Sequence, residues 1–278
     1  MISFPNCKIN FGLNIIQKRA DGYHDLQTVF YPLQIHDALE IIQSSNADTN
    51  SFCEFSTSGL KIEGLPATNL CLKAFEILKK DFPQLPEIKM HLLKKIPIGA
   101  GLGGGSADGA FTLQLLNKKF HLNLSINQLI NYALQLGSDC PFFICNKPCF
   151  GSGRGEILEE IKINLEKYYI VIINPAVHIN TAWAFSQIIP QQPQKSIREI
   201  ILQPIATWKE NLINDFEKPV TENYPEIKFI KEQFYKCGAI YASMSGSGST
   251  IFGVFENQPL LPKFSENYFV QQICPANN

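Results

Sequence analysis

The chain has 278 residues, a formal net charge of -1, 45% hydrophobic residues and 18% charged residues. This globular composition argues against a disordered, collagen-like or coiled-coil chain, and the charge balance gives no support to a nucleic-acid partner. No run of about 18 apolar residues could span a membrane. The eight cysteines include no CxxC pair, and the N-terminus resembles no signal peptide. We therefore expect reduced thiols in a cytoplasmic protein.

Taken in chain order, the apolar periodicity predicts a mixture of strands and helices. The first strand covers residues 7–15, where the alternation places Lys8 and Asn10 on the same face, away from the core. An Asp-Gly pair at 21–22 predicts a tight turn. The later elements are a loop at 44–51, a helix opened by Asn69, a strand through Ile88, Met90 and Leu92, a helix through Ala107, Ala110 and Leu115, a helix capped by Ser125 and Gln128 and ended by Gly137, a strand at 168–173, a helix capped by Ser196 and Glu199, a helix at 225–236, and strands at 239–244 and 250–255.

Strands and helices that do not alternate strictly indicate an α+β fold rather than a doubly wound sheet. A Gly- and Ser-rich stretch at 151–155 precedes an acidic stretch at 156–160, a change of composition typical of a boundary. We therefore expect two domains, covering residues 1–155 and 156–278.

Five glycines fall within the seven residues 99–105. Without side chains, several backbone N–H groups can converge on one anion. The loop leads into a predicted helix, whose first N–H groups lack partners and whose dipole is positive at that end. The order of strand, glycine loop and helix predicts a phosphate site, with a flexible turn as the alternative.

Two common phosphate motifs do not fit this loop. Gly99, Gly101 and Gly104 have the G-x-G-x-x-G spacing, but the acid that a dinucleotide fold places about 20 residues later is missing. No Gly-Lys-Ser/Thr closes the loop, so it is no Walker A motif either. A second glycine-rich loop at 245–249 is either a simple hairpin turn or a second backbone surface for the same ligand.

Several motifs together resemble the GHMP small-molecule kinases. These are the loop from Pro97 to Gly103 before a helix, an early strand that contains lysine, and a late Gly-Ser-Gly loop. The string Arg-Ala-Asp-Gly-Tyr-His at 19–24, the sequence Gly-Gly-Gly-Ser at 103–106 and Leu-Gly-Ser-Asp-Cys-Pro at 136–141 are similar to the branch that acts on a diphosphocytidyl methylerythritol. The resemblance runs from about residue 5 to residue 255, so we expect no transit peptide.

The resemblance implies a fold and a reaction. The implied fold has an N-terminal α/β domain, which binds ATP and contains a left-handed crossover, and a C-terminal ferredoxin-like domain. The implied reaction uses ATP and Mg²⁺ and transfers the γ-phosphoryl group to the 2-hydroxyl group of the diphosphocytidyl methylerythritol, in the non-mevalonate isoprenoid route. The expected partner is a small molecule with a cytidine diphosphate group, not a nucleic acid or a membrane, and we expect a monomer or homodimer.

The resemblance also assigns catalytic roles. Asp139 corresponds to the carboxylate that accepts the hydroxyl proton, although its position before Pro141 also suits a helix N-cap. Lys8 corresponds to the partner lysine that stabilises charge on the reacting oxygens, with an ordinary solvated lysine as the alternative. Asn10, on the same face, could bind the substrate hydroxyl groups. The ligands of the metal are not identified.

Binding residues follow from the same resemblance. Tyr23 would stack on the cytosine and His24 would bind its edge, with an exposed aromatic pair as the alternative. Phe185 matches a second stacking ring, although it could be an ordinary core residue. The further substrate-binding candidates are Thr181, Gly246 and Ser247. The nucleotide-binding candidates are Asn69, which could instead be only a helix cap, Lys94, Pro97, Ile98, Gly99, Ala100, Gly101, Leu102, Gly103, Gly104, Gly105, Ser106 and Ala107.

The sequence departs from the resembled pattern at Ala107-Asp108, where Ser-Asn is common. An acid beside a phosphate site is unfavourable unless Asp108 faces away or helps to hold Mg²⁺. Three other functions are weaker alternatives. The Tyr23–His24 pair argues against a kinase for mevalonate or homoserine, the missing acid argues against a nicotinamide dehydrogenase, and the joint presence of Lys8 and Asp139 argues against a silent nucleotide-binding module.

Overall fold

The computed structural model describes residues 1–44, 52–64 and 66–275. The chain forms two compact units that are interleaved in sequence. The first unit comprises residues 1–7, 34–98 and 103–147, and the second comprises residues 8–33, 99–102 and 148–278. Apart from Ser44, the predicted loop at 44–51 lies outside the described residues.

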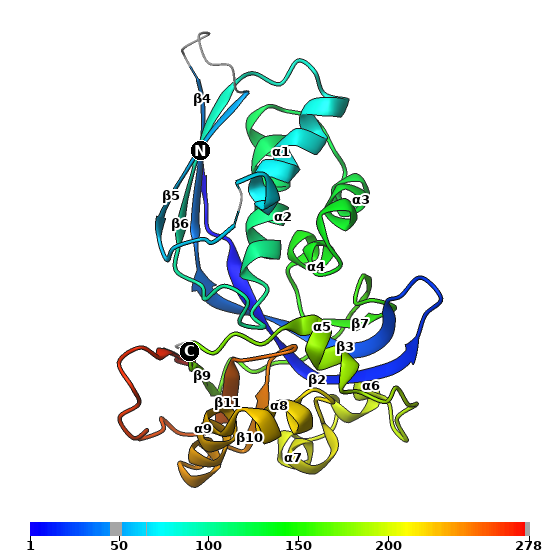
Figure 1. Ribbon diagram of the computed structural model, residues 1–278, viewed down its shortest axis with the longest axis vertical. Helices are drawn as coiled ribbons and strands as arrows, with labels where there is room; N and C mark the ends of the chain where they lie inside the picture. The colour runs from blue at the N-terminus through cyan, green and yellow to red at the C-terminus, as the bar shows by residue number, and fades with distance from the viewer. Residues whose placement is uncertain (45–51, 65, 276–278) are drawn as a thin grey trace. The chain divides into compact units, whose positions relative to one another are not determined.

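The first unit contains a four-stranded sheet in the order β1-β4-β6-β5 (Figure 1). Strand β4 pairs antiparallel with β6, and β5 pairs parallel with β6. Helices α1 and α2 contact this sheet, and α3 and α4 pack beside them. The elements are β1 (Ile2–Ser3), β4 (Ala38–Gln43), β5 (Cys53–Gly59), the 3-10 helix η1 (Pro66–Thr68), α1 (Leu70–Asp81), β6 (Ile88–Lys94), α2 (Gly104–Lys119), α3 (Ile126–Leu136) and α4 (Cys140–Cys145).

Local signals explain these helices and strands. The side chain of Asn69 accepts the N–H of Cys71 at 2.9 Å and so caps α1. Every second residue of β6 is buried, from Ile88 to Lys94, as alternation predicts. Ser125 and Gln128 form the predicted capping box of α3. These predictions are confirmed.

The second unit contains the sheet β10-β11-β9-β12, in which all pairs are antiparallel. Numbered along the chain, these strands lie in the order 2-3-1-4, which is the ferredoxin-like order expected for this part of the chain. The connection from β11 to β12, at residues 256–268, contains no helix. The elements are β9 (Tyr169–Asn174), α5 (Thr181–Ser186), α6 (Ile197–Ile200), η2 (Ile205–Thr207), α7 (Trp208–Asn211), α8 (Glu217–Asn223), α9 (Pro225–Lys236), β10 (Tyr241–Met244), β11 (Ile251–Phe255) and β12 (Phe269–Ile273).

A further sheet has the order β2-β3-β7-β8. Its strands are β2 (Asn6–Lys18), β3 (His24–His36), β7 (Cys149–Ser152) and β8 (Ile157–Glu160). Asp21 and Gly22 form the predicted turn between β2 and β3, and Gly22 has a φ of 87°. The predicted domain boundary between residues 155 and 156 falls in the connection between the paired strands β7 and β8, and that boundary stays a prediction.

The core of the second unit fixes strand β2. Phe11 packs edge-on against Phe252 and Trp208, with ring centroids at 5.1 and 5.3 Å. Helix α9 covers β10 and β11 through buried residues such as Phe234. The apolar face of β2 is therefore anchored, and its other face carries Lys8 and Asn10. Among the described residues, none of the helices has the length and apolar character needed to cross a membrane.

Candidate active site

The first glycine-rich loop has a backbone that other residues rarely adopt. Gly99, Gly101 and Gly103 have φ values of 66°, 78° and 69°, in the left-handed region that favours glycine. Helix α2 begins at Gly104, earlier than the apolar pattern from Ala107 indicated. The flanking Pro97 and Ile98 precede the loop, and Ala100 and Leu102 are buried within it.

The first turn of α2 is suited to an anion. It contains Gly104, Gly105 and Ser106, it has no acidic residue, and no side chain caps it. The N–H groups of this turn lack acceptors within the helix, because Ala107 donates the first helical hydrogen bond, to Gly103 O at 2.9 Å. A Cβ atom added at Gly105 would meet no atom within 4 Å. The turn therefore presents bare N–H groups at the positive end of a sixteen-residue helix.

Asp108 lies one turn further along α2 and faces the interior. Lys94 Nζ donates to Asp37 Oδ2 at 2.5 Å and to Asp108 Oδ2 at 2.6 Å, and the Lys94 side chain is 2% exposed. Burial raises the pKa of Asp108 to about 7, against the opposing effect of Lys94. Burial lowers the pKa of Lys94, but the two carboxylates outweigh this effect and raise it above its ordinary value. The sequence left open whether Asp108 faces away from the predicted phosphate site or helps to hold Mg²⁺, and in the structure it faces away.

Asp37 extends this cluster to the strand that precedes the loop. Its Oδ1 accepts the N–H groups of Lys95 and Ile96 at 2.6 and 2.9 Å. Lys94 and Asp37 thus anchor α2 to the end of β6, a role that the sequence did not indicate. The predicted contacts of Lys94 and Asn69 with a nucleotide stay predictions.

Asp139 occupies the N-cap position of α4, but its side chain makes no capping hydrogen bond. The structure thus gives no support to the alternative that this carboxylate is only a helix cap. The thiol of the next residue, Cys140, hydrogen-bonds to Ser106 in the first turn of α2, and burial raises the pKa of this thiol to about 12. Asp139 is therefore the neighbour of a residue that contacts the first turn of α2 within the first unit.

Lys8 and Asn10 are buried in the second unit, with exposed fractions of 3% and 2%. Lys8 Nζ donates to Asn10 Oδ1 at 2.5 Å and to Gly101 O at 3.1 Å, and it lies 5.4 Å from the centroid of Phe30. The alternative of a solvated strand lysine is wrong, because loop residues cover the polar face of β2. Asn10 also donates through Nδ2 to Thr28 Oγ1 at 3.0 Å.

The two glycine-rich loops touch each other within this unit. Ser245 Oγ donates to Gly101 O at 2.8 Å, and Thr250 N–H donates to Ala100 O at 3.2 Å. A Cβ atom at Gly101 would lie 2.0 Å from Ser245 O, so only glycine permits this approach. The second loop is thus both the turn between β10 and β11 and a backbone surface packed on the first loop.

The predicted substrate residues of the second unit form two pairs. His24 stacks on Phe185, with centroids at 4.7 Å and planes at 18°, and burial lowers the pKa of His24, with Lys18 as a lesser cause. Thr181 Oγ1 and Ser247 Oγ lie 3.2 Å apart, and Gly246 precedes this serine in the second loop.

Tyr23 lies at the tip of the β2–β3 hairpin and is 54% exposed. The Arg154 guanidinium lies 4.8 Å from the centroid of its ring. Asp21 accepts the N–H of Tyr23 at 3.1 Å and fixes the turn. The ring is thus presented at the surface of the second unit, as a residue that stacks on a base requires.

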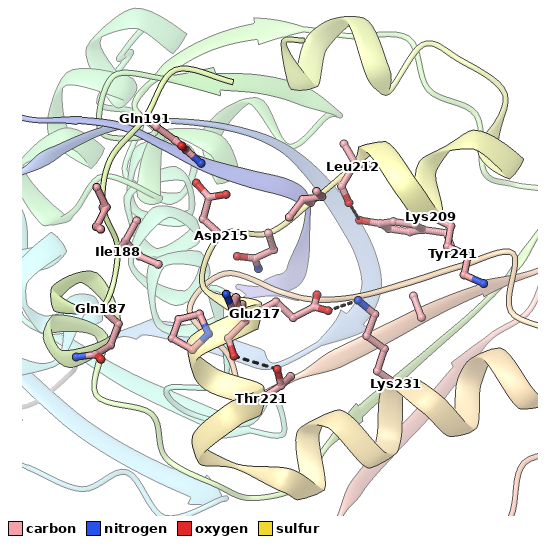
Figure 2. A pocket seen from close by; sticks show the side chains of 16 residues that line it. Gln187, Ile188, Gln191, Lys209, Leu212, Asp215, Glu217, Thr221, Lys231 and Tyr241 are labelled. Atoms are coloured by element: carbon pink, nitrogen blue, oxygen red, sulfur yellow. Dashed lines mark hydrogen bonds and ion pairs between the residues drawn. The ribbon is translucent and has the colours of Figure 1, made fainter. Parts of the chain in front are cut away.

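A cavity of about 610 Å³ also lies in the second unit, bounded by the segment after α5, by α7 and α8, and by β10 (Figure 2). None of the predicted site residues lines it. Glu217, on its wall, pairs with Lys231 and accepts from Ser243 Oγ at 2.9 Å and Met244 N at 3.1 Å. These charged groups bind one another and the end of β10, so they hold the unit together.

Comparisons with known proteins agree on one family. The model of the GHMP kinases N terminal domain matches residues 69–147, and that of the GHMP kinases C terminal domain matches residues 196–268. The chain is 51% identical to the 4-diphosphocytidyl-2-C-methyl-D-erythritol kinase of Bacteroides fragilis and 52% identical to that of Bacteroides thetaiotaomicron, each over 95% of both chains. The chain belongs to this family of GHMP kinases.

Solved structures of GHMP kinases are similar to the chain throughout. A crystal structure of 4-(cytidine 5'-diphospho)-2C-methyl-D-erythritol kinase matches with a TM-score of 0.73 and 28% identity, over 91% of this chain and 90% of that one. The mevalonate kinase of Methanococcus jannaschii matches with a TM-score of 0.71 over 100% and 98%, but at 14% identity, so it shows the fold alone. Membership of the GHMP kinases excludes the nicotinamide dehydrogenase considered from the G-x-G-x-x-G spacing.

In this GHMP kinase, sequence reasoning missed two residues that shape the site. Ser245, which joins the two loops, lies in the second glycine-rich loop, from which the sequence selects only Gly246 and Ser247 as candidates. Arg154 lies in the Gly- and Ser-rich stretch 151–155, which the sequence indicates only as a domain boundary, and its guanidinium contacts Tyr23. A local signal exists for both residues, because each lies in a glycine-rich stretch of the sequence.

Proposed function

We propose that the chain transfers the γ-phosphoryl group of ATP to the 2-hydroxyl group of 4-diphosphocytidyl-2-C-methyl-D-erythritol, in the non-mevalonate route to isoprenoid precursors. The observation that carries this proposal is the identity of 51–52%, over 95% of the chain, with two kinases that bear this substrate in their name. The bare first turn of α2 and the buried Lys8 supply the chemistry that such a transfer needs.

The first turn of α2 binds the phosphate groups of ATP in this proposal. Its free N–H groups and the helix dipole stabilise negative charge, and the absence of an acid in this turn avoids repulsion. Gly104 permits the close packing on which the turn depends, since a Cβ atom there would lie 2.9 Å from Ile96. The loop residues 97–107, together with Asn69, form the proposed nucleotide-binding set, and the buried Lys94 supports this set by anchoring α2 to the end of β6.

Mg²⁺ would reach the protein with the nucleotide. Among the described residues there is no group of three or more His, Cys, Asp or Glu side chains that could hold a metal ion. Such an arrangement fits an ion held mainly by phosphate oxygens. When bound, Mg²⁺ neutralises phosphate charge.

Asp139 and Lys8 have the catalytic roles. The Asp139 carboxylate, which caps no helix, accepts the proton of the attacking 2-hydroxyl group. The Lys8 ammonium, directed by Asn10 and Gly101 O, stabilises the negative charge on the reacting oxygens. Asn10 is the candidate for binding the substrate hydroxyl groups.

The cytidine group binds to the second unit. Tyr23 offers an exposed ring for stacking. His24 offers ring nitrogens to the edge of the base, and Phe185, which stacks on His24, orients it or adds a second aromatic surface. Thr181, Gly246 and Ser247 supply further polar contacts.

One assay tests the proposal. Purified protein is incubated with ATP and Mg²⁺ and with each of three alcohols, namely the diphosphocytidyl methylerythritol, mevalonate and homoserine, and ADP release is measured. We expect turnover with the first alcohol alone. Turnover with mevalonate or homoserine only would refute the proposed substrate.

A further inference from the structure

The irregular segment Ile213–Phe216, between α7 and α8, is tied to strand β2. Leu13 N–H donates to Ile213 O at 2.9 Å, and Asp215 N–H donates to Leu13 O at 2.8 Å. The Asp215 carboxylate also accepts the N–H of Ile15 at 2.8 Å. This segment thus forms a bridge to the strand that carries the proposed catalytic lysine.

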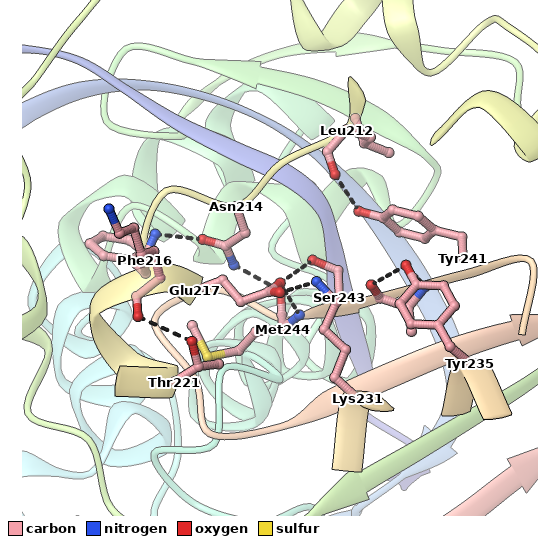
Figure 3. Close-up of polar contacts among 12 residues, drawn as sticks. Leu212, Asn214, Phe216, Glu217, Thr221, Lys231, Tyr235, Tyr241, Ser243 and Met244 are labelled. Carbon is pink, nitrogen blue, oxygen red and sulfur yellow. Dashed lines mark hydrogen bonds and ion pairs between the residues drawn. The ribbon is translucent and has the colours of Figure 1, made fainter. Parts of the chain in front are cut away.

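The side chain of Asn214 points from this segment toward the second glycine-rich loop. Its Nδ2 donates to Met244 O at 2.8 Å, and its Oδ1 accepts the N–H of Phe216 at 3.0 Å (Figure 3). The same Nδ2 donates to Gly246 O at 2.8 Å. The residue is 1% exposed. Within a carboxamide only the NH₂ group donates, so the two contacts with carbonyl oxygens fix the orientation of the Asn214 side chain.

The two carbonyl groups that Asn214 binds flank Ser245. The hydroxyl group of Ser245 donates to Gly101 O at 2.8 Å and accepts the N–H of Asn10 at 3.2 Å. Gly101 O is also the oxygen that accepts from Lys8 Nζ at 3.1 Å. Hydrogen bonds and the backbone of the second loop therefore connect Asn214 to Lys8.

We propose that Asn214 is a positioning residue for phosphoryl transfer. Its carboxamide holds the carbonyl groups on both sides of Ser245, and Ser245 in turn fixes Gly101 O, which directs the Lys8 ammonium. The loop cannot replace these donors from water, because the carboxamide is buried and an unsatisfied buried carbonyl group is costly. This inference rests on the proposed function.

The isosteric variant Asn214→Asp tests the proposal most sharply, because it replaces the donating NH₂ group with an oxygen that repels the two carbonyl oxygens. We expect kcat to fall by about 10–100-fold, the effect of a small displacement of catalytic groups, with a smaller change in the KM for ATP. The matched control is Asn211→Asp. This exposed asparagine donates to Thr207 O at 2.7 Å, and the same chemical change there should leave kcat unaltered.

A pH series provides a rescue that a merely structural role would not show. A carboxyl group buried against carbonyl oxygens has a raised pKa, and its protonated form regains one donor. The ratio of the kcat of Asn214→Asp to that of the wild type should therefore rise as the pH falls from 8 to 6. A ratio that stays constant over this range counts against the proposal.

Hydrogen exchange separates this inference from the proposed function. The N–H groups of Ser245 and Gly248 donate to Thr250 O and Ser245 O, at 2.9 and 3.0 Å, and should exchange faster in Asn214→Asp than in Asn211→Asp. Unchanged exchange together with an unchanged kcat would overturn the inference. If the wild type is inactive while the loop exchanges faster in Asn214→Asp, the proposed function is overturned instead. Should Asn214→Asp fail to fold, Asn214→Ala is expected to show the same loss of kcat and faster exchange, and overturns the inference if it shows neither.

Discussion

Among the described residues, two lysines are buried, and their different partners lead us to propose a structural role for one and a catalytic role for the other. Lys94, in the first unit, donates to the carboxylates of Asp37 and Asp108. Lys8, in the second unit, donates to the neutral oxygens Asn10 Oδ1 and Gly101 O. The two carboxylates neutralise the Lys94 ammonium group, whereas Asn10 Oδ1 and Gly101 O fix the direction of the Lys8 ammonium group. We therefore interpret Lys94 as an anchor of the fold and Lys8 as a group held ready for charge that develops during a reaction.

The substitution Lys94→Met should have the largest effect on stability. It leaves two carboxylates buried without their cation, which costs about 3–5 kcal/mol. Denaturant unfolding measures this change. The control is Lys89→Met on the same strand, whose exposed ion pair with Glu54 spans 2.8 Å and contributes about 0–1 kcal/mol. Equal losses in the two variants would contradict the anchoring role of Lys94.

Lys8→Met should show the opposite pattern to Lys94→Met. We expect kcat to fall by about 10²–10³-fold, the usual effect of removing a group that stabilises the transition state. The free energy of unfolding should fall less than in Lys94→Met, because Lys8→Met leaves Lys94 paired with the carboxylates of Asp37 and Asp108. Steady-state kinetics and denaturant unfolding on the same preparations decide the question. A stable, fully active Lys8→Met would end the distinction between the two lysines.

The titration of Asp108 makes the stability of the folded protein depend on pH. Its pKa is raised to about 7 in the folded protein, chiefly by burial, from an ordinary value of about 4. The folded state therefore binds this proton more tightly than the unfolded state does, and stability from this group is present at low pH and lost as the pH rises toward 7.

The variant Asp108→Asn removes this titration. The unfolding free energy of the wild type, relative to that of the variant, should fall between about pH 4 and pH 7, with a slope of at most about 1.4 kcal/mol per pH unit. Unfolding curves collected across this range measure the difference, and carboxylates shared by both proteins cancel. Parallel profiles would show that Asp108 keeps an ordinary pKa.

Tyr23→Ala should have the smallest effect of the series. Loss of a ring that stacks on a base costs about 1–2 kcal/mol, or about 5–30-fold in KM for the cytidyl substrate. Tyr23→Phe keeps the ring and should keep the KM. If only the KM for ATP changes in Tyr23→Ala, the hairpin has been assigned to the wrong ligand.

The sequence predicted those parts of the fold that local signals determine. Asn69 caps α1, residues 88–94 alternate as a strand, and Ser125 and Gln128 close a capping box, because each signal involves neighbours in the chain. The alternation of β2 also predicted a strand, but placed Lys8 on an open face. The loops that cover this face are distant in sequence, so periodicity could not reveal them.

The residues of the candidate site could be predicted from sequence motifs, but their burial and their contacts in the folded protein could not. The glycine loop, Asp139 and the Tyr23–His24 hairpin could be selected from their residue types and order. The burial of Asp108 against Lys94 depends on packing between α2 and β6, and sequence left its direction open. Asn214 gave no signal, because it lies in an irregular segment and its role depends on contacts with Met244 and Gly246.

The proton acceptor is the central element of the proposed mechanism, and the variant Asp139→Asn tests it most directly. The rate of phosphoryl transfer is measured in a single turnover with saturating ATP, Mg²⁺ and diphosphocytidyl methylerythritol, so that product release does not contribute. We expect the rate to fall by about 10²–10⁴-fold, as for the loss of a positioned general base, while ATP still binds. A rate close to that of the wild type would show that the Asp139 carboxylate takes no part in the reaction.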